Sequence, residues 1–459
     1  MIKNFIKIII ISSLLTSCSS ILNTDRNTVV KTTSSAVGGY LGYELSDGDI
    51  FSTTVGSAFG IILGSYLSEF LGQDDYYFYK RETIKVLEIN DLKILAKKKL
   101  PKMFYDYVDS GSYTESTYKE NEIDFNKIKL RQRVGRDIST SKLSKKFLEK
   151  EYKLPFGFAP CGMGGMLYPD GEILVAKACE KNKIPYILST MSICSIEQVA
   201  ENINEQFWFQ LYVMRDKKFV ENIIKRAEDA KCYALVLTMD LPILAQRHKD
   251  IRNGLSAPPK PSLNSFLQIL KKPQWCLKML RTSNRSFGNI LGHVDGVDDL
   301  SSIVKWADGQ FDPGLSWEYV KWIRKLWKGP LILKGILDED DIKIANELDI
   351  QGIIISNHGG RQLDGTISSI MALKNVINAV RTNLEVFFDG GIRSGKDIVK
   401  ALSLGAKGVF MGRPYLYGLG AMGQPGVEKV IEILVKELNT TLLLTGETDV
   451  NDLDKGNLY

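Results

Sequence analysis

Short apolar runs recur along the chain from about residue 154 onward, and stretches with helical spacing of their apolar positions separate them. Runs of about four to eight apolar residues closed by turn-forming residues are typical of strands buried on both faces. Buried strands that alternate with amphipathic helices favour the α/β class. There are eight such runs, the number that closes a parallel (β/α)8 barrel with its helices outside. They cover Leu154–Ala159, Pro185–Ser189, Phe207–Val213, Ala234–Thr238, Pro330–Lys334, Gly352–Ser356, Glu385–Phe388 and Gly408–Met411.

The regular spacing of these runs is interrupted once, between Thr238 and Pro330, where about ninety residues intervene. That is too long for an ordinary loop between a strand and a helix. The pattern therefore predicts an insertion at about residues 250–310, on the face of the barrel where the strands end. Its mixture of Pro, Lys, Trp and Leu fits either an active-site lid or a segment that touches a membrane.

The first eighteen residues have the pattern of an export signal. Two lysines precede the apolar run 8–11, and Leu15-Thr16-Ser17-Cys18 follows it. The last four residues resemble a lipobox, the site at which bacterial lipoproteins are cleaved and lipidated. We therefore interpret residues 1–18 as a leader; an uncleaved hydrophobic anchor is the alternative.

Residues 19–80 are rich in glycine at intervals of four. Glycines lie at positions 38, 42, 56, 60 and 64, and the 22 residues Ile50–Leu71 contain a single charge, Glu69. This length suffices to cross a bilayer, and a stripe of glycines lets a second helix approach closely. We predict a membrane-associated glycine-zipper segment here, with a glycine-rich linker as the alternative, and assign residues 81–459 to the barrel domain.

Overall composition is that of a globular protein, with 25% charged residues and a net charge of +5. So small a charge on 459 residues argues against a nucleic-acid-binding surface. After Cys18 the chain has five scattered cysteines without a C-x-x-C pair, which indicates reduced thiols, and we expect no bound metal. The chain has three histidines, so any chemistry that needs an imidazole must use one of them.

The most informative polar segment, Ser356–Gly365, directly follows the sixth apolar run. It contains His358 and Arg361 on a glycine-rich strand end, where active sites of such barrels lie. The Arg361 guanidinium can bind a carboxylate, and His358 can take a proton from the atom beside that carboxylate. The alternative is a structural histidine that caps a loop.

A second polar cluster follows the last two runs. Asp389-Gly390-Gly391-Ile392-Arg393 follows the seventh run, and Gly412-Arg413 follows the eighth. Loops at these two places commonly bind a phosphate through glycine amides, a helix N-terminus and cationic side chains. We predict a phosphate site here; two ordinary surface turns are the alternative.

Two further charged residues end strands. Lys334 closes the fifth run, where its ammonium could stabilise negative charge on a reduced cofactor or form a Schiff base. Asp240 follows the fourth run and could hold an imidazole in one tautomer. Alone, Asp240 would more often cap a helix, so its functional interpretation depends on His358.

Taken together, these motifs resemble the FMN-dependent L-2-hydroxy-acid oxidases and dehydrogenases, and the resemblance extends from about Ile89 to the C-terminus. The segments Ser356–Asp364 and Asp389–Arg393 are highly specific to that family. Segments 129–134, 311–317 and 334–338 are similar to those of its bacterial quinone-linked L-lactate dehydrogenases.

The resemblance implies a role for each matching residue. His358 would be the catalytic base and Asp240 its partner. The substrate would be bound by Tyr107, Arg247 and Arg361, and Tyr212 would donate its hydroxyl to the reacting oxygen. FMN would be bound by Pro160, Cys161, Gly162, Ser189, Gln210, Thr238, Lys334, Asp389, Gly390, Gly391, Arg393, Gly412 and Arg413. Two positions vary within the family: Met191 stands where glycolate oxidases have tryptophan, which leaves the preferred length of the substrate open, and Cys161 replaces a small polar or aliphatic residue beside the flavin.

We therefore expect oxidation of L-lactate to pyruvate with a membrane quinone as electron acceptor. An oxidase that uses oxygen on lactate or glycolate is one alternative, and a non-catalytic surface lipoprotein is another. The resemblance also implies a homo-oligomer. The lipobox suggests export, whereas free cysteines and FMN favour the cytoplasm. An anchor on the cytoplasmic face of the inner membrane reconciles them, and an exported lipoprotein remains the alternative.

Overall fold

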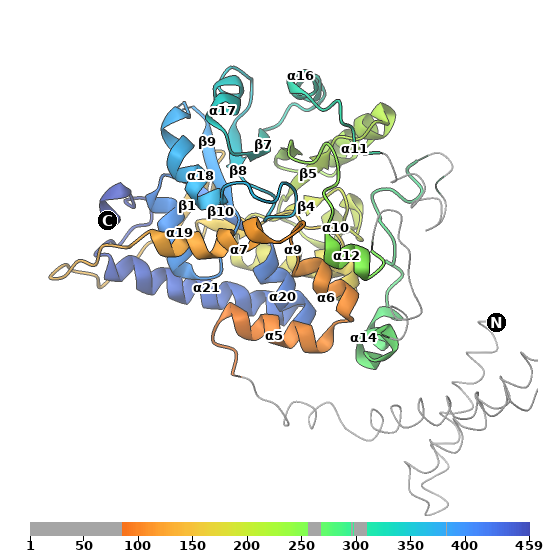
Figure 1. Cartoon of the computed structure of the whole chain (residues 1–459), viewed down its shortest axis with the longest axis horizontal. Coiled ribbons are helices and arrows are strands. Elements are labelled where there is room, and N and C mark those ends of the chain that lie inside the picture. Colours follow the sequence, from red (N-terminus) through yellow and green to blue (C-terminus); the bar gives the residue numbers. More distant parts are fainter. Residues whose placement is uncertain (1–84, 256–267, 295–296, 298–309, 382) are drawn as a thin grey trace, which may run out of the picture. The chain divides into compact units, whose positions relative to one another are not determined.

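The structure is a computed structural model of the chain and describes residues 85–255, 268–294, 297, 310–381 and 383–459 (Figure 1). The predicted leader and glycine-zipper segment lie outside these ranges, as does part of the predicted insertion. The chain divides into two units after Lys85, and the second unit, Val86–Tyr459, is the one considered below. Within the described ranges, no helix has both the length and the apolar composition that a bilayer crossing requires.

Eight parallel strands form the predicted (β/α)8 barrel, which confirms the fold class. Their order is β3-β10-β9-β8-β7-β6-β5-β4, and a parallel bridge between Phe158 and Tyr186 links the two ends of the sheet. Each predicted run overlaps one strand, and β7 and β9 extend one or two residues beyond the predicted ends. The strands are β3 (Phe156–Phe158), β4 (Ile187–Ser189), β5 (Trp208–Tyr212), β6 (Leu235–Thr238), β7 (Leu331–Ile336), β8 (Gly352–Ile355), β9 (Glu385–Asp389) and β10 (Gly408–Met411).

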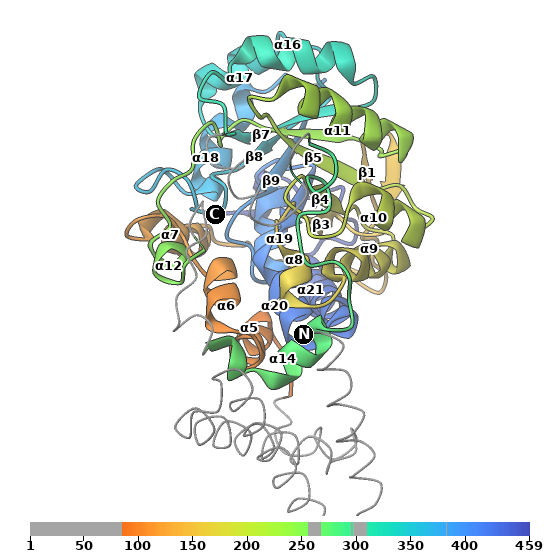
Figure 2. The same ribbon diagram turned by 90° about the vertical axis from the view of Figure 1, so that its right-hand side faces the viewer.

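Helices cover the outside of the sheet (Figures 1 and 2). The longer ones bury an apolar face; the buried face of α11, for example, consists of Phe219, Val220, Ile223, Ile224 and Ala227. The helices that follow the strands are α8 (Gly164–Leu167), α9 (Gly171–Asn182), α10 (Ile196–Asn202), α11 (Lys217–Asp229), α12 (His248–Arg252), α14 (Pro273–Met279), α16 (Trp317–Leu326), α17 (Glu339–Ala345), α18 (Ser369–Val376), α19 (Gly395–Ser403), α20 (Arg413–Met422) and α21 (Gln424–Leu444), with short 3-10 turns at η2 (Ile377–Ala379) and η3 (Lys455–Asn457).

Elements that precede the barrel pack against both of its ends. The helices α5 (Ile89–Lys99), α6 (Lys102–Val108) and α7 (Ser116–Ile123) are followed by the 3-10 turn η1 (Asp124–Lys127). A hairpin then forms from β1 (Lys145–Phe147) and β2 (Lys150–Tyr152), which pair antiparallel. Helix α5 lies beside α20 in both views (Figures 1 and 2).

Large side chains fill the barrel interior at the end where the strands begin. The hairpin contributes Phe147 and Tyr152, and the indole of Trp208 donates a hydrogen bond of 3.1 Å to the Tyr152 hydroxyl. Phe387 and Phe410 pack against the Trp208 ring with centroid distances of 5.6 and 5.2 Å. Because these side chains are fully or almost fully buried, this half of the barrel is solid, and open space remains at the C-terminal ends of the strands.

Helices α20 and α21 cross at two glycines. A Cβ atom on Gly418 would lie 2.5 Å from the carbonyl oxygen of Gly426, and one on Gly426 would overlap the carbonyl oxygen of Gly418. The two backbones are therefore in direct contact, and neither position can hold a side chain without moving a helix.

We expect Gly426→Ala to destabilise the fold by about 1–3 kcal/mol, because the added methyl group overpacks this crossing. Thermal unfolding of the FMN-loaded protein measures the effect as a lower Tm. Thr440→Ala, at an exposed position on the same helix α21, is the matched control and should leave the Tm nearly unchanged. Equal Tm values for Gly426→Ala and wild type would contradict close contact at the crossing.

Candidate active site

A cavity of about 490 Å³ opens at the C-terminal ends of the strands. Sixteen of the residues predicted for the site line it: Tyr107, Pro160, Cys161, Gly162, Tyr212, Thr238, Arg247, Lys334, His358, Arg361, Asp389, Gly390, Gly391, Arg393, Gly412 and Arg413. The other three do not line it. Asp240 and Gln210 are hydrogen-bonded to the lining residues His358 and Thr238, and Ser189 is hydrogen-bonded to Gln210. The cavity thus brings together residues that lie up to about 300 positions apart in the sequence, from Tyr107 to Arg413.

His358 and Asp240 form a hydrogen-bonded pair in this cavity. The Nδ1 atom of His358 lies 2.8 Å from Asp240 Oδ1, and Nε2 lies 3.4 Å from the Tyr212 hydroxyl. Burial lowers the pKa of His358, against the opposing effect of Asp240. Burial acts to raise the pKa of Asp240, but His358 and Lys334 outweigh it and the pKa is lowered. A neutral imidazole whose Nδ1–H donates a hydrogen bond to the ionised Asp240 carboxylate leaves Nε2 as the basic atom.

Local backbone conformation creates the space for this pair. His358 has a φ of +59°, and Gly359 and Gly360 follow with +65° and +72°, so the chain turns sharply after β8. Opposite, Gly335 has a φ of +106°, and a Cβ atom there would lie 2.6 Å from Asp240 Cγ. Glycine at position 335 therefore leaves the room that the Asp240 carboxylate occupies. The second oxygen of that carboxylate, Oδ2, is buried without a hydrogen-bond partner among the described residues.

Two guanidinium groups lie on another wall of the cavity. Arg361 Nη1 donates to the carbonyl oxygen of Tyr107 at 2.6 Å and to Ser110 Oγ at 3.0 Å. Its Nη2 is buried and forms no hydrogen bond with the described residues; the Asp250 carboxylate lies 3.6 Å away as an ion-pair partner, beyond hydrogen-bonding distance. Arg247 Nε donates to the carbonyl oxygen of Arg361 at 3.2 Å, and burial together with Arg361 lowers the pKa of Arg247 to about 10. Paired cations with an unused donor are suited to an anion such as a carboxylate.

Lys334 places a cation at the bottom of the cavity. Its Nζ lies 2.9 Å from Asp389 Oδ2 and donates to Ser356 Oγ at 2.7 Å. Burial acts to lower the pKa of Lys334, but Asp389 and Asp240 outweigh burial and raise it. A charged ammonium held by a carboxylate does not favour the Schiff-base alternative, which requires a neutral amine.

The glycine-rich loops after β9 and β10 form one end of the cavity. Gly390 and Gly391 have φ values of +109° and +82°, and a Cβ atom on Gly391 would overlap the backbone of Asn121. A Cβ atom on Gly412 would lie 2.9 Å from Cys161 Sγ. These three lining positions therefore cannot hold a larger side chain without displacing their neighbours, and they leave this end of the cavity free of side chains, which suits a phosphate-binding cradle.

The two arginines of these loops are partly engaged by neighbouring segments. Arg393 Nη2 contacts the Glu122 carboxylate at 2.7 Å. Arg413 donates from Nε to the carbonyl oxygen of Val108 at 3.0 Å and from Nη2 to that of Ser110 at 2.7 Å. Both guanidinium groups therefore connect the cavity end to the α6–α7 region, and the segment from Val108 to Ser110 is held by Arg361 as well as Arg413.

Cys161 and its neighbours come directly after β3. Burial raises the pKa of Cys161, so the group beside the cavity is a protonated thiol. A Cβ atom on Gly162 would lie 3.2 Å from the Tyr107 hydroxyl and 3.1 Å from Met191 Cβ. The missing side chain at position 162 therefore lets Tyr107 and Met191 approach each other.

A chain of buried side chains connects β4, β5 and β6 behind the wall. Ser189 Oγ donates to Gln210 Oε1 at 3.0 Å, and Gln210 Nε2 donates to Thr238 Oγ1 at 2.9 Å. Asn289 Nδ2 contacts the carbonyl oxygens of Ser189 and Thr190, both at 3.3 Å. The residue pattern around Asn289 does not predict this role, because Asn289 contacts a segment about 100 residues earlier in the chain.

The described part of the insertion forms one side of the cavity. Residues 285–287 line it, and Ser286 Oγ is buried there without a described partner. Helix α14 is fixed through Trp275, whose indole donates to the carbonyl oxygen of Met166 at 3.0 Å and whose ring packs on Phe104. These contacts attach the described part of the insertion to the mouth of the barrel.

The residues around the cavity fit FMN. A side-chain-free cradle with two arginines at one end matches a phosphate, and a buried ammonium together with an amide and hydroxyl chain matches a polar ring system. Arg361, Arg247 and His358 line another polar region of the cavity, where a second, small molecule can bind.

Comparisons with known proteins agree with this fit. The sequence model of a family described as FMN-dependent dehydrogenase matches residues 96–459. An L-lactate dehydrogenase of Pseudomonas syringae pv. syringae (strain B728a) is 41% identical over 366 residues, which are 80% of this chain and 96% of the relative. An L-lactate dehydrogenase of Vibrio parahaemolyticus serotype O3:K6 is 40% identical over 369 residues, 80% of this chain and 97% of the relative.

Solved structures resemble the chain over the same region. A crystal structure described as the monotopic membrane protein (S)-mandelate dehydrogenase has a TM-score of 0.78 and 33% identity, and the match covers 82% of this chain and 99% of that one. A double mutant of flavocytochrome b2 with pyruvate bound has a TM-score of 0.68 and 30% identity, covering 82% and 87% of the two chains.

Proposed function

The chain belongs to the family of FMN-dependent dehydrogenases, and we propose that it oxidises L-lactate to pyruvate at the cavity described above. One observation carries the proposal: the basic Nε2 of His358 faces the same cavity as a guanidinium nitrogen of Arg361 that has no described hydrogen-bond acceptor. A 2-hydroxy acid needs both a cation for its carboxylate and a base for the adjacent carbinol. L-Lactate is supported by the names of the relatives with 40–41% identity.

In this proposal the substrate carboxylate binds Arg361 and Arg247, beside Tyr107. The hydroxyl-bearing carbon then lies near His358 and Tyr212, whose ring nitrogen and hydroxyl are 3.4 Å apart. His358 takes a proton from the hydroxyl or from the carbon itself, and the resulting imidazolium is stabilised by the Asp240 carboxylate at 2.8 Å. A fixed carboxylate contributes here because it stabilises charge that appears only during the reaction.

FMN would supply the two-electron acceptor. Gly390, Gly391, Gly412 and the two loop arginines would hold its phosphate, and Lys334 would provide a cation against its ring system. Pro160, Cys161 and Gly162 would pack against the ring from the loop after β3, and Ser189, Gln210 and Thr238 would offer polar groups to the ring or the ribityl chain. The Lys334–Asp389 pair fixes the position of that cation before any ligand binds.

We expect His358→Gln to retain FMN but to lose bleaching of the flavin absorbance when L-lactate is added without oxygen. The loss should be about 10²–10⁴-fold in rate, the usual contribution of a general base. His248→Gln, which alters a histidine in helix α12, is the matched control and should bleach at the wild-type rate. A near wild-type rate for His358→Gln would remove His358 as the base.

A quinone is the electron acceptor that we propose. A membrane location supports it, because quinones dissolve in the bilayer and a similar structure is described as a monotopic membrane protein. Oxygen is the alternative, which would make the enzyme an oxidase.

Enzyme reduced by L-lactate should therefore pass electrons to a water-soluble quinone analogue far faster than to oxygen. Stopped-flow measurement of flavin reoxidation with each acceptor compares the two rates directly. Stoichiometric hydrogen peroxide, formed as fast as the quinone is reduced, would instead assign an oxidase.

We further propose that the barrel works on the cytoplasmic face of the inner membrane. The five free cysteines of the described barrel support this location, since reduced thiols are typical of the cytoplasm. An exported lipoprotein is the alternative.

Asn451→Cys places a thiol at an exposed turn and tests the side of the membrane. A membrane-impermeant maleimide should label this variant only after the cells are permeabilised, and the wild-type protein, treated in parallel, corrects for its own cysteines. Strong labelling of Asn451→Cys in spheroplasts, with the inner membrane intact, would place the barrel outside the cytoplasm.

A further inference from the structure

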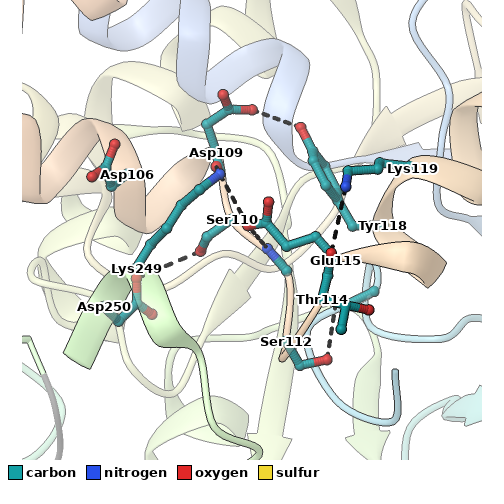
Figure 3. Close-up of polar contacts among 12 residues, drawn as sticks. Asp106, Asp109, Ser110, Ser112, Thr114, Glu115, Tyr118, Lys119, Lys249 and Asp250 are labelled. Atoms are coloured by element: carbon teal, nitrogen blue, oxygen red, sulfur yellow. Dashed lines mark hydrogen bonds and ion pairs between the residues drawn. The ribbon is translucent and has the colours of Figure 1, made fainter. Parts of the chain in front are cut away.

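A buried acid, Asp250, lies behind the two guanidinium groups of the cavity. It is the third residue of α12, whose N-cap residue is Arg247, and its side chain is almost fully buried. Asp250 Oδ2 lies 3.6 Å from Arg361 Nη2. Its Oδ1 lies 3.5 Å from Ser110 Oγ (Figure 3). Arg361 Nη1 contacts the same hydroxyl at 3.0 Å.

Contacts on both sides of Asp250 fix helix α12 in place. The neighbouring Lys249 donates to the carbonyl oxygen of Asp109 and contacts the Glu115 carboxylate, both at 2.9 Å (Figure 3). One turn later, Asn253 Nδ2 donates to Asp106 Oδ2 at 2.7 Å. These contacts hold the backbone of α12 against the α6–α7 segment, which keeps Asp250 beside Arg361.

The position of Asp250 matters because of the charges of the two arginines beside it. Arg247 and Arg361 are like charges, each in the other's vicinity and both poorly hydrated. Asp240 is paired with His358, and Asp389 is paired with Lys334, so neither carboxylate neutralises the two arginines. Asp250 is the acid whose charge acts on both guanidinium groups. Burial raises the pKa of Asp250, and the two arginines oppose that rise.

We propose that Asp250 is a positioning residue that acts through Arg361 and Arg247 to select monocarboxylates over dicarboxylates. Two cations with one fixed anion leave a single net positive charge, which one ligand carboxylate neutralises. A second carboxylate on the ligand would then remain unpaired in a desolvated cavity, at a high cost. The inference rests on the proposed function, in which the arginine pair receives the substrate carboxylate.

The test compares two anions on the FMN-loaded full-length protein. Malonate is the dicarboxylate probe and pyruvate the monocarboxylate, and perturbation of the flavin absorbance reports the Kd of each. In Asp250→Asn the site gains net positive charge, so we expect the Kd of malonate to fall about tenfold and that of pyruvate about threefold. A merely structural role would weaken both anions instead.

Asp124→Asn is the matched control. Asp124 is a buried acid outside this cluster, whose carboxylate contacts Lys127 and accepts from Ser368. Its substitution should leave the ratio of the two Kd values at the wild-type level. Asp250→Glu, which keeps the charge, should also preserve that ratio.

Unchanged or weaker malonate binding in Asp250→Asn, with a wild-type flavin spectrum, would overturn the proposal, as would an equal gain for both anions. If Asp250→Asn does not retain FMN, Asp250→Ser removes the same charge with a smaller side chain and gives the same readout. Failure of the proposed function is distinguishable, because it would appear as wild-type enzyme that L-lactate does not bleach, whatever the ratio of the Kd values.

Discussion

The structure depends on one constraint: charged groups at the C-terminal ends of the barrel strands are buried, so each needs a fixed partner. Lys334 has Asp389, His358 has Asp240, and the arginine pair has Asp250. Removing any partner would leave a charge in a low-dielectric cavity, which costs far more than the loss of a surface ion pair. The positive φ values of His358 and Gly335 belong to the same arrangement, because they bring the imidazole and its carboxylate within hydrogen-bonding distance.

Much of the fold could be predicted because its signals are local. Each strand of the barrel is a short continuous apolar run closed by a turn former, so all eight were found within a few residues of their ends. The cavity-lining positions followed from the same pattern, since residues after parallel strands converge on one face. Family membership and dependence on FMN were also expected from the motifs around His358 and Asp389, and the match over residues 96–459 confirms both.

Other features have no local signal. Asp250 is one of many acids in the sequence, and its proximity to Arg361 arises only when α12 packs against the α6–α7 segment. Asn289 reaches β4 across about 100 residues, and nothing in its neighbourhood predicts that contact. The hydrogen bonds that join Ser189, Gln210 and Thr238 across three strands likewise arise only when the barrel closes. Such pairings depend on tertiary packing and not on the residue pattern of any single segment.

The aromatic side chains that fill the barrel at the end where its strands begin have a kinetic consequence. In the described part of the chain, this end of the barrel is closed by Phe147, Tyr152 and Trp208. Ligands therefore enter and leave the cavity at the end where the strands finish. A hydroxy acid and an electron acceptor would then share one opening, and we expect the oxidised product to leave before the acceptor enters. Turnover under that restriction follows a ping-pong order, in which double-reciprocal plots at different acceptor concentrations are parallel lines.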